Sequence, residues 1–148
     1  MNRHVGCIML ALAAGCSGIK TYPQSSPRNV LVRTDLSKVE AALNIHEVGA
    51  DCRTTYRGTI TLDKASISVG IPADRLGYLV FNFASSSFLR GSSNANVGTL
   101  LKPRPGFNYE VEVSYRDDIY SVVIRETDAR KSLSRELPRR GLESCRPS

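Results

Sequence analysis

The sequence predicts an all-β domain, an antiparallel β-sandwich or small barrel of about seven to nine strands. Three observations lead to this prediction. Apolar and polar residues alternate with a period of two along much of the chain. Segments rich in Gly, Pro, Asn and Ser separate the alternating stretches. Two neighbouring stretches also match each other, residue for residue, as the arms of a hairpin.

Three strands are expected early in this domain. Val30 and Val32, two positions apart and flanked by Asn29 and Arg33, predict the first. Residues 56–62, with Ile60 and Leu62 on one face, predict the second. Residues 65–71, ended by Pro72, predict the third.

The stretch 37–48 has two interpretations. Apolar residues at 39, 41, 43 and 45 alternate with their neighbours, as in a strand. A helix is the alternative, because Ser37 and Glu40 fit a capping box and positions 39, 42 and 43 share helical spacing. We favour the strand, because the elements that follow are all β.

Residues 77–83 are almost continuously apolar, which is expected of a central strand covered on both faces. Residues 84–98 are rich in Ser, Asn and Gly, and predict a long loop around Phe88 and Leu89. A short strand is expected over 99–102, before Pro103.

Residues 107–126 have the pattern of a hairpin. Apolar residues alternate on both arms, and Asp117 and Asp118 supply a two-residue loop. A one-residue slip would divide the apolar side chains between the two faces, so pattern and turn specify one register. That register pairs Tyr115 with Tyr120, Val113 with Val122, and Val111 with Ile124.

The stretch that opens this hairpin, Pro-Gly-Phe-Asn-Tyr-Glu-Val over residues 105–111, is similar to the strand entry of transthyretin-like modules. The similarity covers about twenty residues and implies a sandwich, which agrees with the alternation.

The first fifteen residues have the layout of a secretory signal peptide. Arg3 precedes an uncharged apolar stretch over 5–14, which is shorter than the roughly 20 residues that a transmembrane helix needs. We therefore expect a signal peptide over 1–15.

Cys16 follows Ala-Ala-Gly and resembles the lipobox cysteine of bacterial lipoproteins, although Ala13 stands where that family usually has Leu. The resemblance implies a diacylglyceryl group on Cys16 and cleavage just before it. Ser17, where an Asp usually signals inner-membrane retention, implies the periplasmic face of the outer membrane. The alternative is an ordinary signal peptide that leaves Cys16 as a free thiol. Residues 16–28 are polar and Pro-containing, so we expect a flexible tether there and a folded domain over 29–148.

Cys52 and Cys145 remain once Cys16 and the signal peptide are set aside. An even pair in an exported protein predicts a disulfide. A metal-binding or reactive thiol pair is less consistent with the sequence, because no CxxC spacing or nearby histidine accompanies them. The formal net charge of +6 favours anionic envelope polymers as partners, and the expected location argues against nucleic acid.

No catalytic motif is found in the sequence, and we predict no catalytic residue, no metal site and no cofactor. His46 is the only histidine after the signal peptide, and we expect it on a solvent-facing strand position. Glu110 and Glu112 share one face of the hairpin, which their place on its polar side explains without catalysis.

Two regions are candidate partner-binding sites. The first is Phe88, Leu89 and Arg90 at the centre of the predicted loop, and the second is the basic C-terminal stretch with Arg139 and Arg140. We expect a lipid-anchored envelope protein that binds or scaffolds another envelope protein or an anionic polymer. An inhibitor of a wall-degrading enzyme is the alternative, and a wall-sugar hydrolase is a further one.

Overall fold

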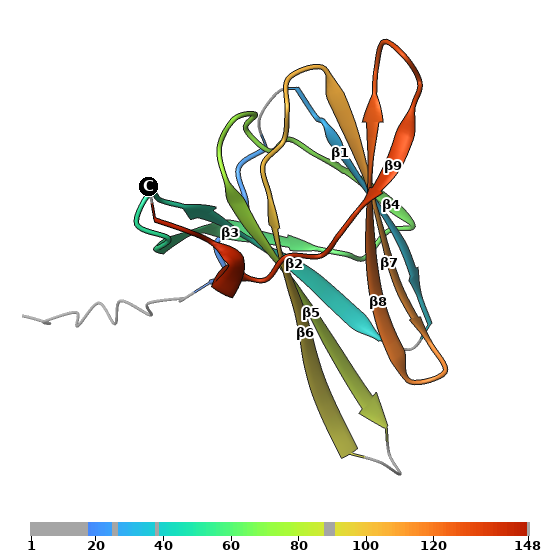
Figure 1. The fold of residues 1–148 in the computed structure, drawn as a ribbon. Helices are drawn as coiled ribbons and strands as arrows, with labels where there is room; N and C mark the ends of the chain where they lie inside the picture. Colours follow the sequence, from blue (N-terminus) through green and yellow to red (C-terminus); the bar gives the residue numbers. More distant parts are fainter. Residues whose placement is uncertain (1–17, 25–26, 38, 88–90, 148) are drawn as a thin grey trace, which may run out of the picture.

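Residues 18–24, 27–37, 39–87 and 91–147 are described by a computed structural model of the chain (Figure 1). Within them, nine strands form two sheets, which confirms the predicted all-β sandwich. One sheet has the order β4-β1-β7-β8-β9 and the other β3-β2-β5-β6. The strands are β1 (Val30–Leu36), β2 (Glu40–Val48), β3 (Thr54–Thr61), β4 (Ser66–Val69), β5 (Gly77–Ser87), β6 (Gly91–Leu101), β7 (Phe107–Arg116), β8 (Ile119–Asp128) and β9 (Ser134–Leu137).

The core lies between the sheets and is built from alternate residues of the inner strands. Val32 on β1 lies opposite Val111 on β7, and Leu43 on β2 lies opposite Phe81 on β5. Burying one such side chain stabilises the fold by about 1.5–3 kcal/mol. The core strands contribute Val30, Val32, Leu43, Ile45, Leu79, Phe81, Phe83, Tyr109, Val111 and Val113.

The β7–β8 hairpin has the predicted register. Tyr115 pairs with Tyr120, Val113 with Val122, and Val111 with Ile124. Asp117 and Asp118 have φ angles of 51° and 63°, as both central residues of a type I′ turn do. The hairpin prediction is therefore confirmed. The stretch 37–48 is also settled as a strand, since β2 covers Glu40–Val48.

The predicted loop over 84–98 is wrong. β5 continues to Ser87, β6 begins at Gly91, and the two strands pair over their full length as a ribbon (Figure 1). Ser, Asn and Gly have low strand propensity, but backbone pairing that begins in the apolar part of β5 extends through them. Phe88, Leu89 and Arg90 lie outside the described residues.

The expectation that residues 77–83 are covered on both faces is also wrong. Leu79, Phe81 and Phe83 are buried in the core, whereas Tyr78 and Val80 on the opposite face are only half-buried. No second layer of described strands covers that face.

The tether predicted over 16–28 is not a tether along its whole length. The Tyr22 amide donates to the Thr59 carbonyl at 3.0 Å, and the Thr59 amide donates to the Lys20 carbonyl at 2.8 Å. The Tyr22 ring is buried in the core. Gly58 allows this close approach, because a Cβ there would lie 2.5 Å from the Tyr22 Cα. We call residues 20–24 the N-terminal segment.

The C-terminal segment, residues 139–145, crosses from β9 in one sheet to β6 in the other. The Leu100 amide donates to the Arg140 carbonyl at 2.7 Å, and the segment ends in a short 3₁₀ helix, η1 (Leu142–Ser144). It thus ties the two sheets together.

In the described part of the chain, no helix combines the length and apolar character that a membrane crossing requires.

Candidate binding surface

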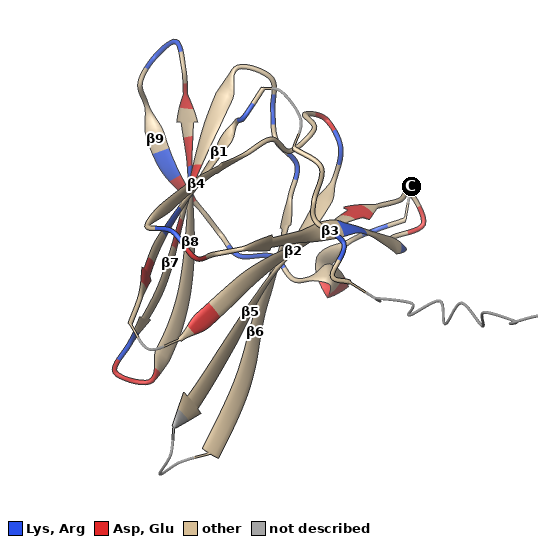
Figure 2. Cartoon of the chain, turned by 180° about the vertical axis from the view of Figure 1, so that it is seen from behind, with Lys and Arg blue, Asp and Glu red and all other residues tan. Residues whose placement is uncertain are grey.

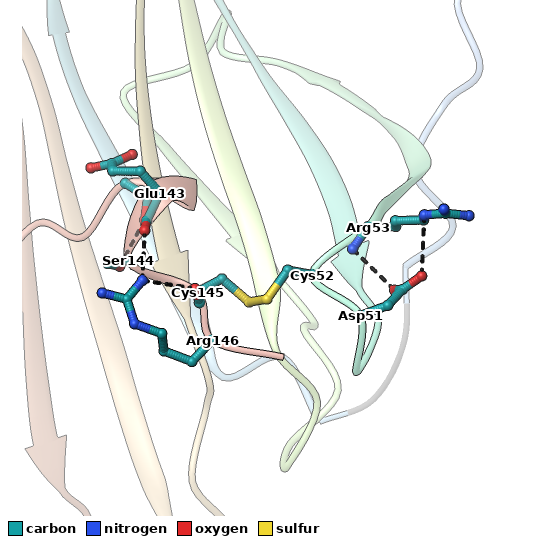
Figure 3. The surroundings of a disulfide bond; sticks show 8 residues. Asp51, Cys52, Arg53, Glu143, Ser144, Cys145 and Arg146 are labelled. Carbon is teal, nitrogen blue, oxygen red and sulfur yellow. Dashed lines mark hydrogen bonds and ion pairs between the residues drawn. A yellow bond between two sulfur atoms is a disulfide. The ribbon is translucent and has the colours of Figure 1, made fainter. Parts of the chain in front are cut away.

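Cys52 and Cys145 are joined by a disulfide, with the sulfurs 2.06 Å apart (Figure 3). Cys52 lies in the turn between β2 and β3, where its amide donates to the Gly49 carbonyl at 3.0 Å. The bond fixes the end of the C-terminal segment to this turn. The predicted pairing of the two cysteines is confirmed. Cys16, the predicted lipidation site, lies outside the described residues.

A buried carboxylate, Glu126 on β8, holds the other end of the molecule together. Tyr109 Oη donates to it at 2.8 Å, Arg104 Nε at 3.1 Å and Arg135 Nε at 2.9 Å. Burial raises the pKa of Glu126, but these hydrogen bonds outweigh burial and hold the pKa below its ordinary value. The charge joins β7, β8, β9 and the segment before β7, so its role is structural.

Most charged residues lie on the five-stranded sheet and in the loops, whereas the four-stranded sheet carries Glu40 and Glu47 on β2 and Arg57 on β3 (Figure 2). Arg33 pairs with Glu110 at 3.0 Å, and Arg125 pairs with Glu112 at 2.8 Å, in a ladder across β1, β7 and β8. Glu110 and Glu112 are thus accounted for as ion-pair partners. β5 and β6 carry no charged residue in their described length (Figure 2).

The basic C-terminal stretch does not form one patch. Arg125 and Arg135 are engaged with Glu112 and Glu126, which neutralises them. Arg139 and Arg140 are exposed and make no ion pair within the described residues, so the two predicted contact residues remain available.

The outer face of the four-stranded sheet is different in character. Three aromatic rings form a row across β3, β2 and β5: the His46 ring centroid lies 5.5 Å from that of Tyr56 and 6.3 Å from that of Tyr78. Tyr56 is 38% exposed. Burial lowers the pKa of His46, so the imidazole is neutral at pH 7 and the row carries no charge.

The Tyr78 ring lies against β6 at Gly98. A Cβ at Gly98 would overlap the Tyr78 phenol, so the glycine provides the space in which the ring lies on the sheet. This role of Gly98 could not be recognised from the sequence, because the pairing of β5 with β6 was not predicted.

Hydroxyl and amide groups continue the face beyond the aromatic row. Thr59 Oγ1 donates to Asn44 Oδ1 at 2.6 Å, and the Tyr56 hydroxyl lies 2.5 Å from Thr59 Oγ1. In the next row, Asn82 on β5 lies between Ala42 on β2 and Asn96 on β6. The bonds fix the positions of Tyr56, Thr59 and Asn44 on the face.

An open pocket of about 1000 Å³ lies at this end of the molecule and is lined by residues of both sheets. Asn82, Asn94 and Asn96 contribute uncharged polar groups to it. Its charged lining residues are Asp35, Glu40, Asp63 and Lys64. Asn94 and Asn96 make no side-chain hydrogen bond to other described residues. Among the described residues, no group of three or more His, Cys, Asp and Glu side chains is placed to hold a metal ion.

The sequence predicted neither the aromatic row nor the amide rows, because each is assembled from residues on different strands. The signal that could have found them is the alternation of Tyr78, Val80 and Asn82 with the core residues of β5. No family model, curated protein or solved structure matches this chain.

Proposed function

We propose that the protein is a lipid-anchored binding protein of the cell envelope, and that the outer face of β3-β2-β5-β6 contacts a neutral glycan of the cell wall. Cys16 is the proposed lipid attachment site, and the periplasmic side of the outer membrane is the proposed location. The observation that carries the binding role is the outer face of this sheet, on which an uncharged aromatic row adjoins amides and hydroxyls.

The chemistry of this face suits a sugar chain. A sugar ring presents hydroxyls around its rim and C–H groups on its faces. Amide side chains can both donate and accept hydrogen bonds to hydroxyls, and an aromatic ring offers an apolar surface beside a polar group.

The anchor and the N-terminal segment together support this role. Lys20, where pairing with β3 begins, is the fourth residue after Cys16, so the folded domain would stay within about 14 Å of the lipid. A domain held there can link the membrane to the wall without catalysing a reaction.

The test is co-sedimentation of the full-length protein, in detergent, with insoluble wall polysaccharide. We expect the double variant Tyr78→Leu, Asn82→Ala to bind about tenfold more weakly, since it removes two central contacts of the face. Asn108→Ala, an exposed asparagine on β7 in the other sheet, is the matched control and should bind like the unaltered protein.

An ionic mode through Arg139 and Arg140 is distinguished by salt. Screening weakens contacts between exposed charges, whereas contacts of the neutral face persist. Binding that disappears in 1 M salt (Debye length about 3 Å), or that falls only in the Arg139→Ala, Arg140→Ala variant, would contradict the proposed face.

A further inference from the structure

The two sheets have four edges, and three of them are protected. β3 carries Arg57, and the N-terminal segment pairs with it at Thr59. β4 is four residues long, and β9 carries Arg135 and Glu136. Short strands, charges and covering segments are the usual means by which proteins prevent strands from adding to an edge.

The fourth edge, β6, has none of these protections over most of its length. It is eleven residues long and uncharged. The C-terminal segment covers only its far end, where the Leu100 amide donates to the Arg140 carbonyl. That hydrogen bond also fixes which peptide groups point outward: Leu100 and, by alternation, Ser92, Asn94, Asn96 and Gly98.

We infer that β6 pairs with β6 of a second copy of this chain, antiparallel and about a two-fold axis at Ala95. In this register Ser92 lies opposite Gly98 of the other copy, and Asn94 lies opposite Asn96. Each of these opposed pairs presents its amide and carbonyl groups to the other strand, as hydrogen-bonded antiparallel pairs do. The four-stranded sheets of two copies become one continuous sheet.

A second copy is the occupant that this edge fits. An isologous contact requires a surface that is complementary to itself. The edge meets this requirement, because its side chains are small or amide-bearing and no like charges come face to face. The chain as a whole has a net charge of +6, so a contact through its charged sheet would bring cations together. The Arg140 carbonyl already accepts from the Leu100 amide, so pairing with a second copy ends at Gly98. The remaining outward positions, 92 to 98, are centred on Ala95, which gives the register of the pair.

The pairing goes beyond the proposed function and uses neither the anchor nor the glycan. It would place the two outer faces side by side, so that one linear polymer could contact both. Two linked sites bind a polymer more tightly than one, without any new contact.

The test is disulfide crosslinking of the full chain in membranes. Ala95→Cys places two thiols opposite each other on the axis, in a non-hydrogen-bonded pair with Cα atoms about 4.5 Å apart, within the range of a disulfide. Ser93→Cys, on the same strand and the same face, places its two thiols about 13 Å apart along the strand, which no disulfide spans. The unaltered chain controls for the native cysteines.

We expect a homodimer for Ala95→Cys and none for Ser93→Cys. Adding Asn96→Pro to Ala95→Cys should reduce the dimer at least about tenfold, because proline removes an outward N–H without removing a bond to β5. Thermal unfolding of this variant is the control that tests whether it still folds. The inference is overturned if Ala95→Cys stays monomeric, links to a different protein, or crosslinks no better than Ser93→Cys. Failure here leaves the glycan-binding result unaffected, because that assay does not depend on pairing.

Discussion

At the scale of single residues, Glu126 keeps its charge in a buried site because donors surround it. Removing one partner of a buried ion pair destabilises more than the pair itself contributes, since the remaining groups lose their partner. Arg104 and Arg135 are partly exposed and recover water when Glu126 is changed, which limits the loss.

We expect Glu126→Gln to lower the free energy of unfolding by about 2 kcal/mol at pH 7. The pKa of Glu126 is lower in the folded state than in the unfolded chain, so its contribution is complete above the ordinary glutamate pKa of about 4.3 and is lost as the pH falls below it. Denaturant unfolding between pH 7 and pH 3 measures both effects. Glu112→Gln, in a surface pair, should change stability by less than about 0.5 kcal/mol. Equal losses in the two variants would contradict the structural role of Glu126.

Cys52 is a second residue whose conformation matters. Its φ angle is 62°, a left-handed conformation that glycine adopts readily and most other residues avoid. The disulfide to Cys145 explains why a cysteine occupies this position.

We expect Cys52→Ser in a Cys145→Ser background to have a free energy of unfolding roughly 4 kcal/mol below that of the oxidised parent protein, because the disulfide no longer closes a long loop in the unfolded chain. Cys52→Gly in the same background should lose about 1 kcal/mol less, because glycine relieves the left-handed conformation. Thermal unfolding compares both with the oxidised parent protein. A Cys52→Ser melting temperature equal to that of the parent would show that the bond does not stabilise the fold.

At the scale of elements, sequence patterns succeeded where local rules decide the structure. The β7–β8 hairpin has regular alternation on both arms and a two-residue turn, so its register could be derived residue by residue. The β5–β6 ribbon was missed because its Ser, Asn and Gly residues resemble a loop, and pairing with the neighbouring strand overrides that preference.

β9 and the docking of the N-terminal segment were missed for a different reason. β9 has four residues, and Arg135 within it bonds to Glu126 on another strand. The docking of Tyr22 depends on Gly58, thirty-six positions later. The one hint of this docking in the sequence is that a glycine stands within a strand. Contacts of this kind are not visible in a local pattern, and the proposed binding face, which draws on four strands, is assembled in the same way.

At the scale of the whole molecule, the two sheets differ in character. The five-stranded sheet carries the charge ladder and the buried Glu126, which fix the fold. The four-stranded sheet presents a polar face with an aromatic row and an open β6 edge. The N-terminal segment lies on β3 of this sheet, so a lipid on Cys16 would hold the proposed binding face close to the membrane.

The most direct test of this account is the mass of the mature protein's N-terminal peptide after extraction from cell membranes. We expect a chain that begins at Cys16 and carries a diacylglyceryl group. We expect the Cys16→Ala variant to be neither processed nor lipidated. A mature chain that begins elsewhere, or an unmodified Cys16 thiol, would contradict the anchored binding protein proposed here.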